Sequence, residues 1–228
     1  MVDLSTDAPA KRTGGLTTLI RIGILALPLG NAFKLVGNLG TFNSVGYGIP
    51  AATEADIAAG PGYFLGNLFG SILPVLLGIL GMFALFGYLA GRADRRTIVS
   101  ALVCAVLGAG ITLAALGVVT YAIPALAHAY QAGDTAAMTV ANRFFTWPWG
   151  AIFYPAVLFP IGLILFCTAL WRSTTISRTA IVLAGFSGVL IAIPVPIHSI
   201  RLAGGVLGLA AGAWLAIAIR RDLARSPR

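Results

Sequence analysis

Six apolar segments dominate the chain and decide what kind of structure it can form. Hydrophobic residues make up 58% of the 228 residues and charged residues only 10%, whereas an ordinary soluble domain has about 25% charged residues. A soluble fold cannot bury so much apolar surface. Each segment is close to the roughly 20 residues that a helix needs to cross a bilayer. The sequence therefore predicts an all-α integral membrane bundle of six transmembrane helices, at residues 16–37, 63–90, 98–127, 150–171, 179–199 and 202–219.

The segments leave no stretch long enough for a separate soluble domain. We expect a cytoplasmic N-terminal tail at 1–15, a six-helix transmembrane domain at 16–219 and a basic cytoplasmic C-terminal tail at 220–228. Lys11 and Arg12 precede the first apolar run as they would in a signal peptide, but the run is longer and no cleavage motif follows it. We therefore interpret it as a true first span.

Basic residues are distributed unevenly between the two sets of connections. Only Arg143 and Arg201 fall on one side, whereas eleven fall on the other: Lys11, Arg12, Arg92, Arg95, Arg96, Arg172, Arg178, Arg220, Arg221, Arg225 and Arg228. Cytoplasmic loops carry the excess of Lys and Arg. The pattern predicts that both termini are cytoplasmic, in a multi-pass protein of the bacterial inner (plasma) membrane. The formal net charge of +8 then indicates contact with the lipid bilayer, and we expect no nucleic acid partner.

The two long connections, 38–62 and 128–149, both lie on the outer side in this topology. In the first, we expect Thr53 to cap a short helix through Ala59, with Glu54 and Asp56 in its first turn. Before the second, Pro124 disfavours helix at the preceding residue. The third helix is therefore expected to tilt or to end early, which would place His128 in a loop.

A stripe of glycines in the sixth segment indicates close helix packing. Gly204, Gly208 and Gly212 repeat every four residues, and small residues let membrane helices approach closely. The simplest interpretation is packing inside the bundle. The alternative is a homodimer, or a contact with another membrane protein, through the same three residues.

One hairpin carries a resemblance to known proteins. The stretch GLILFCTALWRSTTISRTAIVLAGFSGVL, at residues 162–190, and AGDTAAMTVANRFF before it resemble a recurring element of an uncharacterised family of small bacterial six-helix membrane proteins, a domain of unknown function. The resemblance covers about the last half of the chain. It implies the six-helix fold and carries no activity and no site residue with it.

Catalytic patterns are missing from the sequence. There is no HExxH, GxSxG or phosphate-binding GxxxxGK motif, and we expect neither a cofactor nor a metal. All seven acidic residues lie in the predicted tails or loops: Asp3, Asp7, Glu54, Asp56, Asp94, Asp134 and Asp222. Proton-driven transporters relay protons through ionisable groups inside the membrane, so the absence of a mid-membrane carboxylate disfavours that class.

The first helix carries the main candidate site. Asn31, Lys34 and Asn38 are spaced to share one helical face, and a polar face should not point at lipid. Further polar residues at similar predicted depth are Asn67, His128, His198 and Arg201. Together they would line an outward-facing crevice that favours an anionic or strongly dipolar ligand.

Two simpler interpretations of the same residues stay open. Lys34 can extend to the interface while the asparagines cap or bridge helices, or Glu54 or Asp56 can fold back and pair with Lys34. We therefore expect a non-enzymatic protein, either an accessory subunit or a binder or transporter of a small ligand. The alternatives are a membrane-embedded enzyme acting on a lipid or isoprenoid, and a redox subunit in which His128 and His198 hold a haem.

Overall fold

The computed structural model describes residues 8–39, 50–144, 157–174, 176–192 and 198–225, with side chains for 15–37, 50–144, 157–174, 176–190 and 202–225. These residues are helical and include no strand, which confirms the all-α prediction. The elements, in chain order, are α1 (Ala8–Gly23), α2 (Ala26–Leu39), α3 (Ala51–Ala59), α4 (Pro61–Asn67), the π-helix η2 (Leu68–Ile72), α5 (Leu73–Leu89), α6 (Arg95–Gln131), α7 (Ala137–Arg143), α8 (Leu158–Ser173), α9 (Arg178–Ala192) and α10 (His198–Arg225).

Four helical stretches are long and apolar enough to cross a membrane. They are Gly15–Gly37, Pro61–Leu89, Arg95–Gln131 and Leu202–Arg225. The helices α8 and α9 are also apolar, but they are shorter, with 16 and 15 residues. Large apolar side chains are exposed along the bundle, for example Leu19 at 68% and Phe83 at 50%, as expected where lipid is the solvent. The described residues thus form a helical membrane bundle with four candidate spans, and the count of six stays a prediction.

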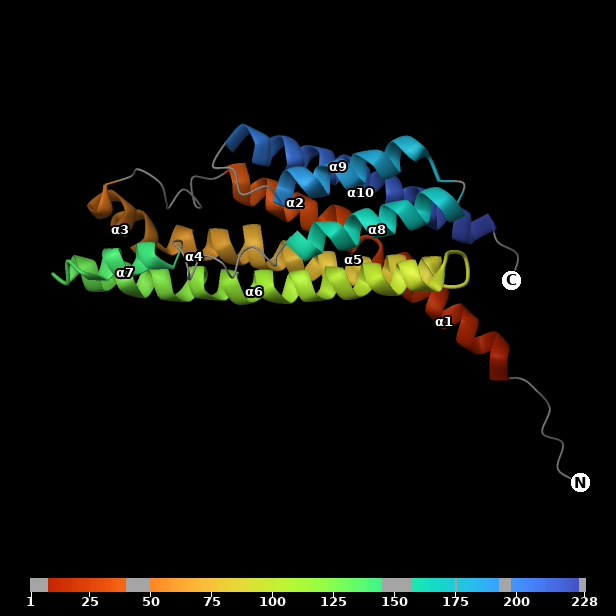
Figure 1. Ribbon diagram of the computed structural model, residues 1–228, viewed down its shortest axis with the longest axis horizontal. Coiled ribbons are helices and arrows are strands. Elements are labelled where there is room, and N and C mark those ends of the chain that lie inside the picture. Colours follow the sequence, from red (N-terminus) through yellow and green to blue (C-terminus); the bar gives the residue numbers. More distant parts are fainter. Residues whose placement is uncertain (1–7, 40–49, 145–156, 175, 193–197, 226–228) are drawn as a thin grey trace, which may run out of the picture.

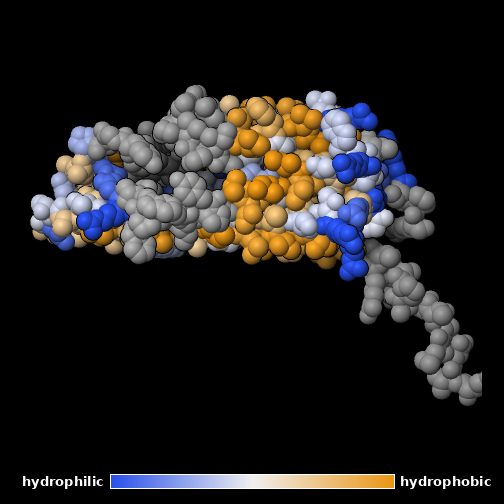
Figure 2. All heavy atoms as spheres, viewed as in Figure 1, coloured by the Kyte–Doolittle hydropathy of each residue, from blue (hydrophilic) through white to orange (hydrophobic). Residues whose placement is uncertain are grey.

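The bundle has two different ends (Figure 1). At one end, α1 begins, α10 ends, and the α5–α6 and α8–α9 connections turn. We call it the basic end, because eight exposed arginines lie there: Arg92, Arg95, Arg96, Arg172, Arg178, Arg220, Arg221 and Arg225. The other end, which we call the cap end, consists of α3, α7 and the last turns of α6. Apolar residues cover much of the surface between the ends, and hydrophilic residues gather at the basic end (Figure 2).

Glycines bring the first span close to its neighbours. Gly23, Gly30 and Gly37 are seven residues apart and contact the helix formed by η2 and α5. A Cβ atom added at Gly30 would lie 3.1 Å from the Pro74 carbonyl oxygen, and one at Gly37 would overlap the Gly70 backbone. The α2 and η2 backbones therefore touch directly, at a distance that no other residue type permits.

The helix α10 packs on α2 through its own glycines. A Cβ at Gly208 would lie 2.5 Å from the Asn31 Oδ1 atom, and one at Gly212 would lie 3.1 Å from the Pro28 nitrogen. Gly204 is buried as well. The predicted close packing of this stripe is confirmed for Gly208 and Gly212, whose contacts lie within the chain. A homodimer through the stripe stays a prediction.

Two prolines act differently on their helices. The first span breaks between α1 and α2, four residues before Pro28, which cannot donate to the Ile24 carbonyl and would clash with it. That carbonyl accepts a bond from the Leu27 amide at 3.3 Å instead. By contrast, the prediction that the third helix ends near Pro124 is wrong, because α6 continues to Gln131. His128 is accordingly helical and does not lie in a loop.

Packing at the cap end explains why α6 continues. A second hydrophobic cluster lies there, separate from the main core of the bundle, and joins Ala55, Ala58, Tyr63, Ile123, Ala127, Met138 and Ala141. Ile123 and Ala127 flank Pro124 and are buried in it, so their burial offsets the cost of the proline. With 37 residues, α6 is about 55 Å long, whereas the hydrocarbon core is about 30 Å thick. Its last turns therefore carry α3 and α7 beyond the apolar belt.

The short helix α3 differs from its prediction at one terminus. It ends at Ala59 as expected, but it begins at Ala51 after Pro50, and no side chain caps it. Thr53 therefore lies inside the helix. Pro50 has a φ of −56°, and its carbonyl accepts the bond from the Glu54 amide at 3.0 Å. Proline at the boundary thus starts the helix earlier than a threonine cap would. Glu54 lies in the first turn as predicted, and Asp56 lies beyond it.

Candidate functional site

The polar stripe of α2 begins with Asn31, which lies at the contact with α10. Its Nδ2 atom donates a hydrogen bond to the Leu27 carbonyl oxygen at 3.0 Å, and its Oδ1 atom occupies the space that a side chain at position 208 would need. Asn31 thus faces a neighbouring helix and not lipid. This orientation is required for the predicted crevice, and it also fits an asparagine that merely bridges two helices.

The rest of the stripe continues towards the cap end. Lys34 is half-buried and engaged in a polar or electrostatic contact. Asn38 belongs to the last turn of α2, and its side chain lies outside the described residues. Asp56 accepts a hydrogen bond from Gln131 Nε2 at 3.0 Å, and Glu54 is buried against the cap cluster. The pairing of Lys34 with an outer-loop acid stays a prediction.

The start of α10 lies level with the end of α2. Pro28 meets Gly212, Asn31 meets Gly208 and Leu35 meets Gly205, so the two helices run antiparallel. Continuing this register brings the last turn of α2, with Asn38, to the level of the first turn of α10. That turn contains His198 and Arg201, whose side chains lie outside the described residues.

Asn67 and His128 occupy separate positions. Asn67 is the last residue of α4 and is buried, and its Nδ2 atom donates to the Tyr63 carbonyl oxygen at 3.1 Å. The π-helix η2 follows it directly. His128 is exposed on α6, one turn before the Gln131 that bonds Asp56 in the cap. His128 thus belongs to the cap, whereas Asn31 lies inside the bundle. Ligand binding by the predicted set, and a haem between His128 and His198, stay predictions.

Several polar groups are buried at or near the cap end. Glu54 is 5% exposed and Thr120 is fully buried, and the Thr120 hydroxyl has no hydrogen-bond partner among the described residues. The Tyr63 hydroxyl donates to the Val119 carbonyl oxygen only at 3.5 Å. Burial raises the pKa of Glu54 above its ordinary value. The sequence placed Glu54 among the loop acids and carried no sign that it is buried.

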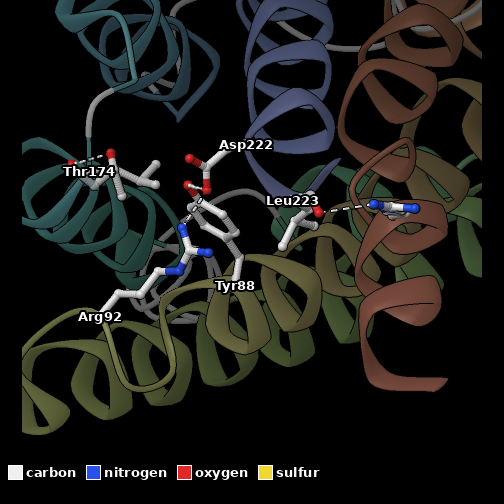
Figure 3. Close-up of polar contacts among 7 residues, drawn as sticks. Tyr88, Arg92, Thr174, Asp222 and Leu223 are labelled. Atoms are coloured by element: carbon white, nitrogen blue, oxygen red, sulfur yellow. Dashed lines mark hydrogen bonds and ion pairs between the residues drawn. The ribbon is translucent and has the colours of Figure 1, made fainter. Parts of the chain in front are cut away.

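The basic end contains a polar network that sequence reasoning missed (Figure 3). Asp222 in α10 accepts a hydrogen bond from the Tyr88 hydroxyl at 2.9 Å and one from Arg92 Nη1 at 2.5 Å. The Arg92 guanidinium also lies over the Tyr88 ring, 4.4 Å from its centre. The network joins the end of α5, the α5–α6 connection and the end of α10. The sequence held one signal for this network, since Asp222 is the sole acid among the arginines of residues 220–228.

Two further polar contacts order the basic end. Arg21 of α1 donates from Nη2 to the Leu223 carbonyl oxygen of α10 at 3.0 Å. Asp94 caps α6 by accepting bonds from the Thr97 amide and hydroxyl, each at 2.9 Å. The bond from the Thr97 amide lowers the pKa of Asp94 below its ordinary value. These contacts join helices and loops. None of them pairs a nucleophile with a base.

Within the part of the chain that the structure describes, no three His, Cys, Asp or Glu side chains gather as a metal site would require. Cys104 and Cys167 are free thiols inside apolar helices. The chain matches no family model, no curated protein and no solved structure, so the resemblance of residues 162–190 stays a prediction.

Proposed function

We propose that the protein is a multi-pass protein of the bacterial inner membrane that binds a small anionic or strongly dipolar ligand on its outer side, without catalysing a reaction on it. In this proposal six helices cross the bilayer, both termini are cytoplasmic, and the cap end faces outward. The binding residues would lie where the end of α2 meets the start of α10.

One observation carries the proposal. The polar face of α2 is turned towards α10, since Asn31 lies against Gly208 and Lys34 is half-buried one turn further along. A cationic side chain is expensive to hold inside a membrane bundle and is usually retained for function. The register of the two helices brings the turn with Arg201 level with the last turn of α2, about one turn beyond Lys34, and two cations this close favour an anionic partner.

The sidedness rests on charge. The eight exposed arginines of the basic end share one end of the bundle, as loops and tails on the cytoplasmic side are expected to do. The cap end carries Arg143 as its described basic side chain, together with Glu54, Asp56 and Asp134. These contrasts support an outward-facing cap end and hence a ligand that arrives from outside.

A ligand screen with a matched pair of variants tests the binding role. Purified protein in detergent is screened by thermal shift against small carboxylates, phosphates and zwitterions, in parallel with Lys34→Gln and Lys11→Gln. The chain has two lysines, and Lys11 lies in the first helix near the opposite end. A ligand of the proposed site should stabilise the wild type and Lys11→Gln, and Lys34→Gln should need at least tenfold more of it.

Two results would count against the proposal. Equal stabilisation of both lysine variants would show that any ligand binds elsewhere. If no compound stabilises the wild type and Asn31→Leu is as stable as the wild type, the stripe serves only helix packing.

A further inference from the structure

The basic end carries positive charge well in excess of its acids. Eight exposed arginines lie there, and the described carboxylates at this end are Asp94 and Asp222. Both carboxylates are already engaged, because Asp94 caps α6 and Asp222 binds Arg92 and Tyr88. Asp94 also attracts Arg96, and Asp222 also attracts Arg225, but two carboxylates cannot balance the charge of eight arginines.

The basic end also uses one type of basic residue. Every exposed basic side chain described at this end is an arginine. The orientation of a membrane protein can be set equally well by lysine. The planar guanidinium differs because it presents a fork of N–H donors that matches two oxygens of a phosphate, whereas lysine offers a point charge.

One of these arginines lies where a helix alone would disfavour it. Arg95 and Arg96 open α6 beside its capping residue Asp94, whereas Arg178 opens α9, which has no acid in its first turn. The N-terminus of a helix carries partial positive charge, so cations there are unfavourable. Arg178 is also held against an aromatic side chain, since its guanidinium lies 5.0 Å from the centre of the exposed Trp171 ring. Tryptophan prefers the headgroup level of a membrane, so this pair marks the depth of the lipid phosphates.

From this charge, residue type and depth, we infer that the arginines of the basic end bind the phosphate headgroups of anionic phospholipids in the leaflet that surrounds that end. The bound phosphates supply the negative charge that the first turn of α9 lacks. The inference rests on the membrane location proposed above, but it is independent of any ligand at the cap end.

Lipid selectivity of the purified full-length chain tests this inference. Native mass spectrometry in neutral detergent, with equimolar phosphatidylglycerol and phosphatidylcholine added, gives the ratio of the two bound lipids. We expect the wild type to retain phosphatidylglycerol at least tenfold over phosphatidylcholine. A juxtamembrane arginine contributes roughly fivefold to anionic lipid affinity, so Arg95→Gln/Arg96→Gln/Arg178→Gln should lower the ratio more than tenfold.

Two further variants show whether a loss of lipid selectivity comes from the arginines of the basic end, from charge in general or from misfolding. Arg143→Gln, at the cap end, should keep the wild-type ratio. Arg95→Lys/Arg96→Lys/Arg178→Lys keeps the charge and should fall between the wild type and the glutamine variant. The glutamine variant retains eight of the eleven basic residues on its side, so its orientation should be unchanged, and a reporter fused after Arg228 checks this.

Three outcomes would overturn the inference. The first is a wild-type ratio near one. The second is an equal loss of selectivity in Arg143→Gln, which would indicate general charge attraction. The third is displacement of the lipid by inorganic phosphate at an ionic strength where chloride has no effect, which would make free phosphate the ligand. None of these results bears on Lys34, so ligand binding between α2 and α10 is tested separately.

Discussion

The two ends of this bundle hold their helices together by different means. At the basic end, side chains from three elements meet in a network of partnered groups around Asp222, and α1 is joined to α10 by a bond from Arg21. Towards the cap end, α2 meets η2 through bare backbone at Gly37 and Gly70. One buried polar atom without a hydrogen-bond partner among the described residues lies in each half, the Thr120 hydroxyl towards the cap end and Arg21 Nε at the basic end.

The difference matters because a network of partnered side chains fixes one arrangement of the helices that it joins. A π-helix lies towards the cap end, and such segments often occur at functional sites. We therefore expect the cap end to open more readily than the basic end and to be the end that exchanges ligand.

The largest effect is expected at the glycine contact. In Gly70→Leu the new side chain would overlap the α2 backbone at Gly37, and no rotamer change relieves an overlap with backbone. We expect a loss on the order of 3 kcal/mol, seen as a lower apparent thermal midpoint in detergent and in lipid.

The matched control for this variant is Gly110→Leu. Gly110 lies on an exposed face of α6, where an added Cβ meets nothing within 4 Å, so its midpoint should stay near that of the wild type. If both variants behaved alike, the backbone contact would not be what holds α2 against η2.

A smaller effect is expected from the network at the basic end. Asp222→Ala removes the acceptor of both Tyr88 and Arg92, whose pairing is partly exposed to solvent, so we expect a loss of about 1 kcal/mol. A double-mutant cycle with Tyr88→Phe should show coupling between the two positions. Strict additivity would mean that the network adds nothing to the contact between α5 and α10.

The smallest effect concerns pH at the cap end. Burial raises the pKa of Glu54 in the folded protein, so the folded state favours the protonated carboxyl. The contribution of Glu54 to stability is therefore fully present below its unfolded pKa and is lost as pH rises through the raised folded pKa. Glu54→Gln should accordingly be more stable than the wild type at about pH 8, and the difference in midpoint should vanish towards pH 4.

A gain for Glu54→Gln that is equal at all pH values would indicate a packing effect of the amide, and the titration account would then be wrong.

Much of the architecture follows from local sequence. The apolar segments are long enough to identify spans without any knowledge of their neighbours, and the arginines that flank them gather at one end as predicted. Helix packing through Gly208 and Gly212 also followed from their spacing. The seven-residue spacing of Gly23, Gly30 and Gly37 was equally available as a signal and predicts a second packing face on the first span.

The remaining features depend on which helices become neighbours, which local sequence does not encode. The network around Asp222 forms only because α5 ends beside α10. Pro124 stays helical because Ile123 and Ala127 are buried by α3 and α7, and Glu54 is buried by the same packing. Tertiary contacts here override the local preferences on which the predictions were based.

The central claim is that the two ends lie on opposite sides of the bilayer, with the basic end in the cytoplasm. Reporter fusions test it most directly, with an enzyme active only in the cytoplasm and one active only outside, each fused after Arg96, Arg178 and Arg228 and near Glu54 and Asp134. We expect the first three sites to report cytoplasm and the last two to report the outside. A cytoplasmic signal near Glu54 or Asp134 would contradict the topology and, with it, the outward-facing ligand site.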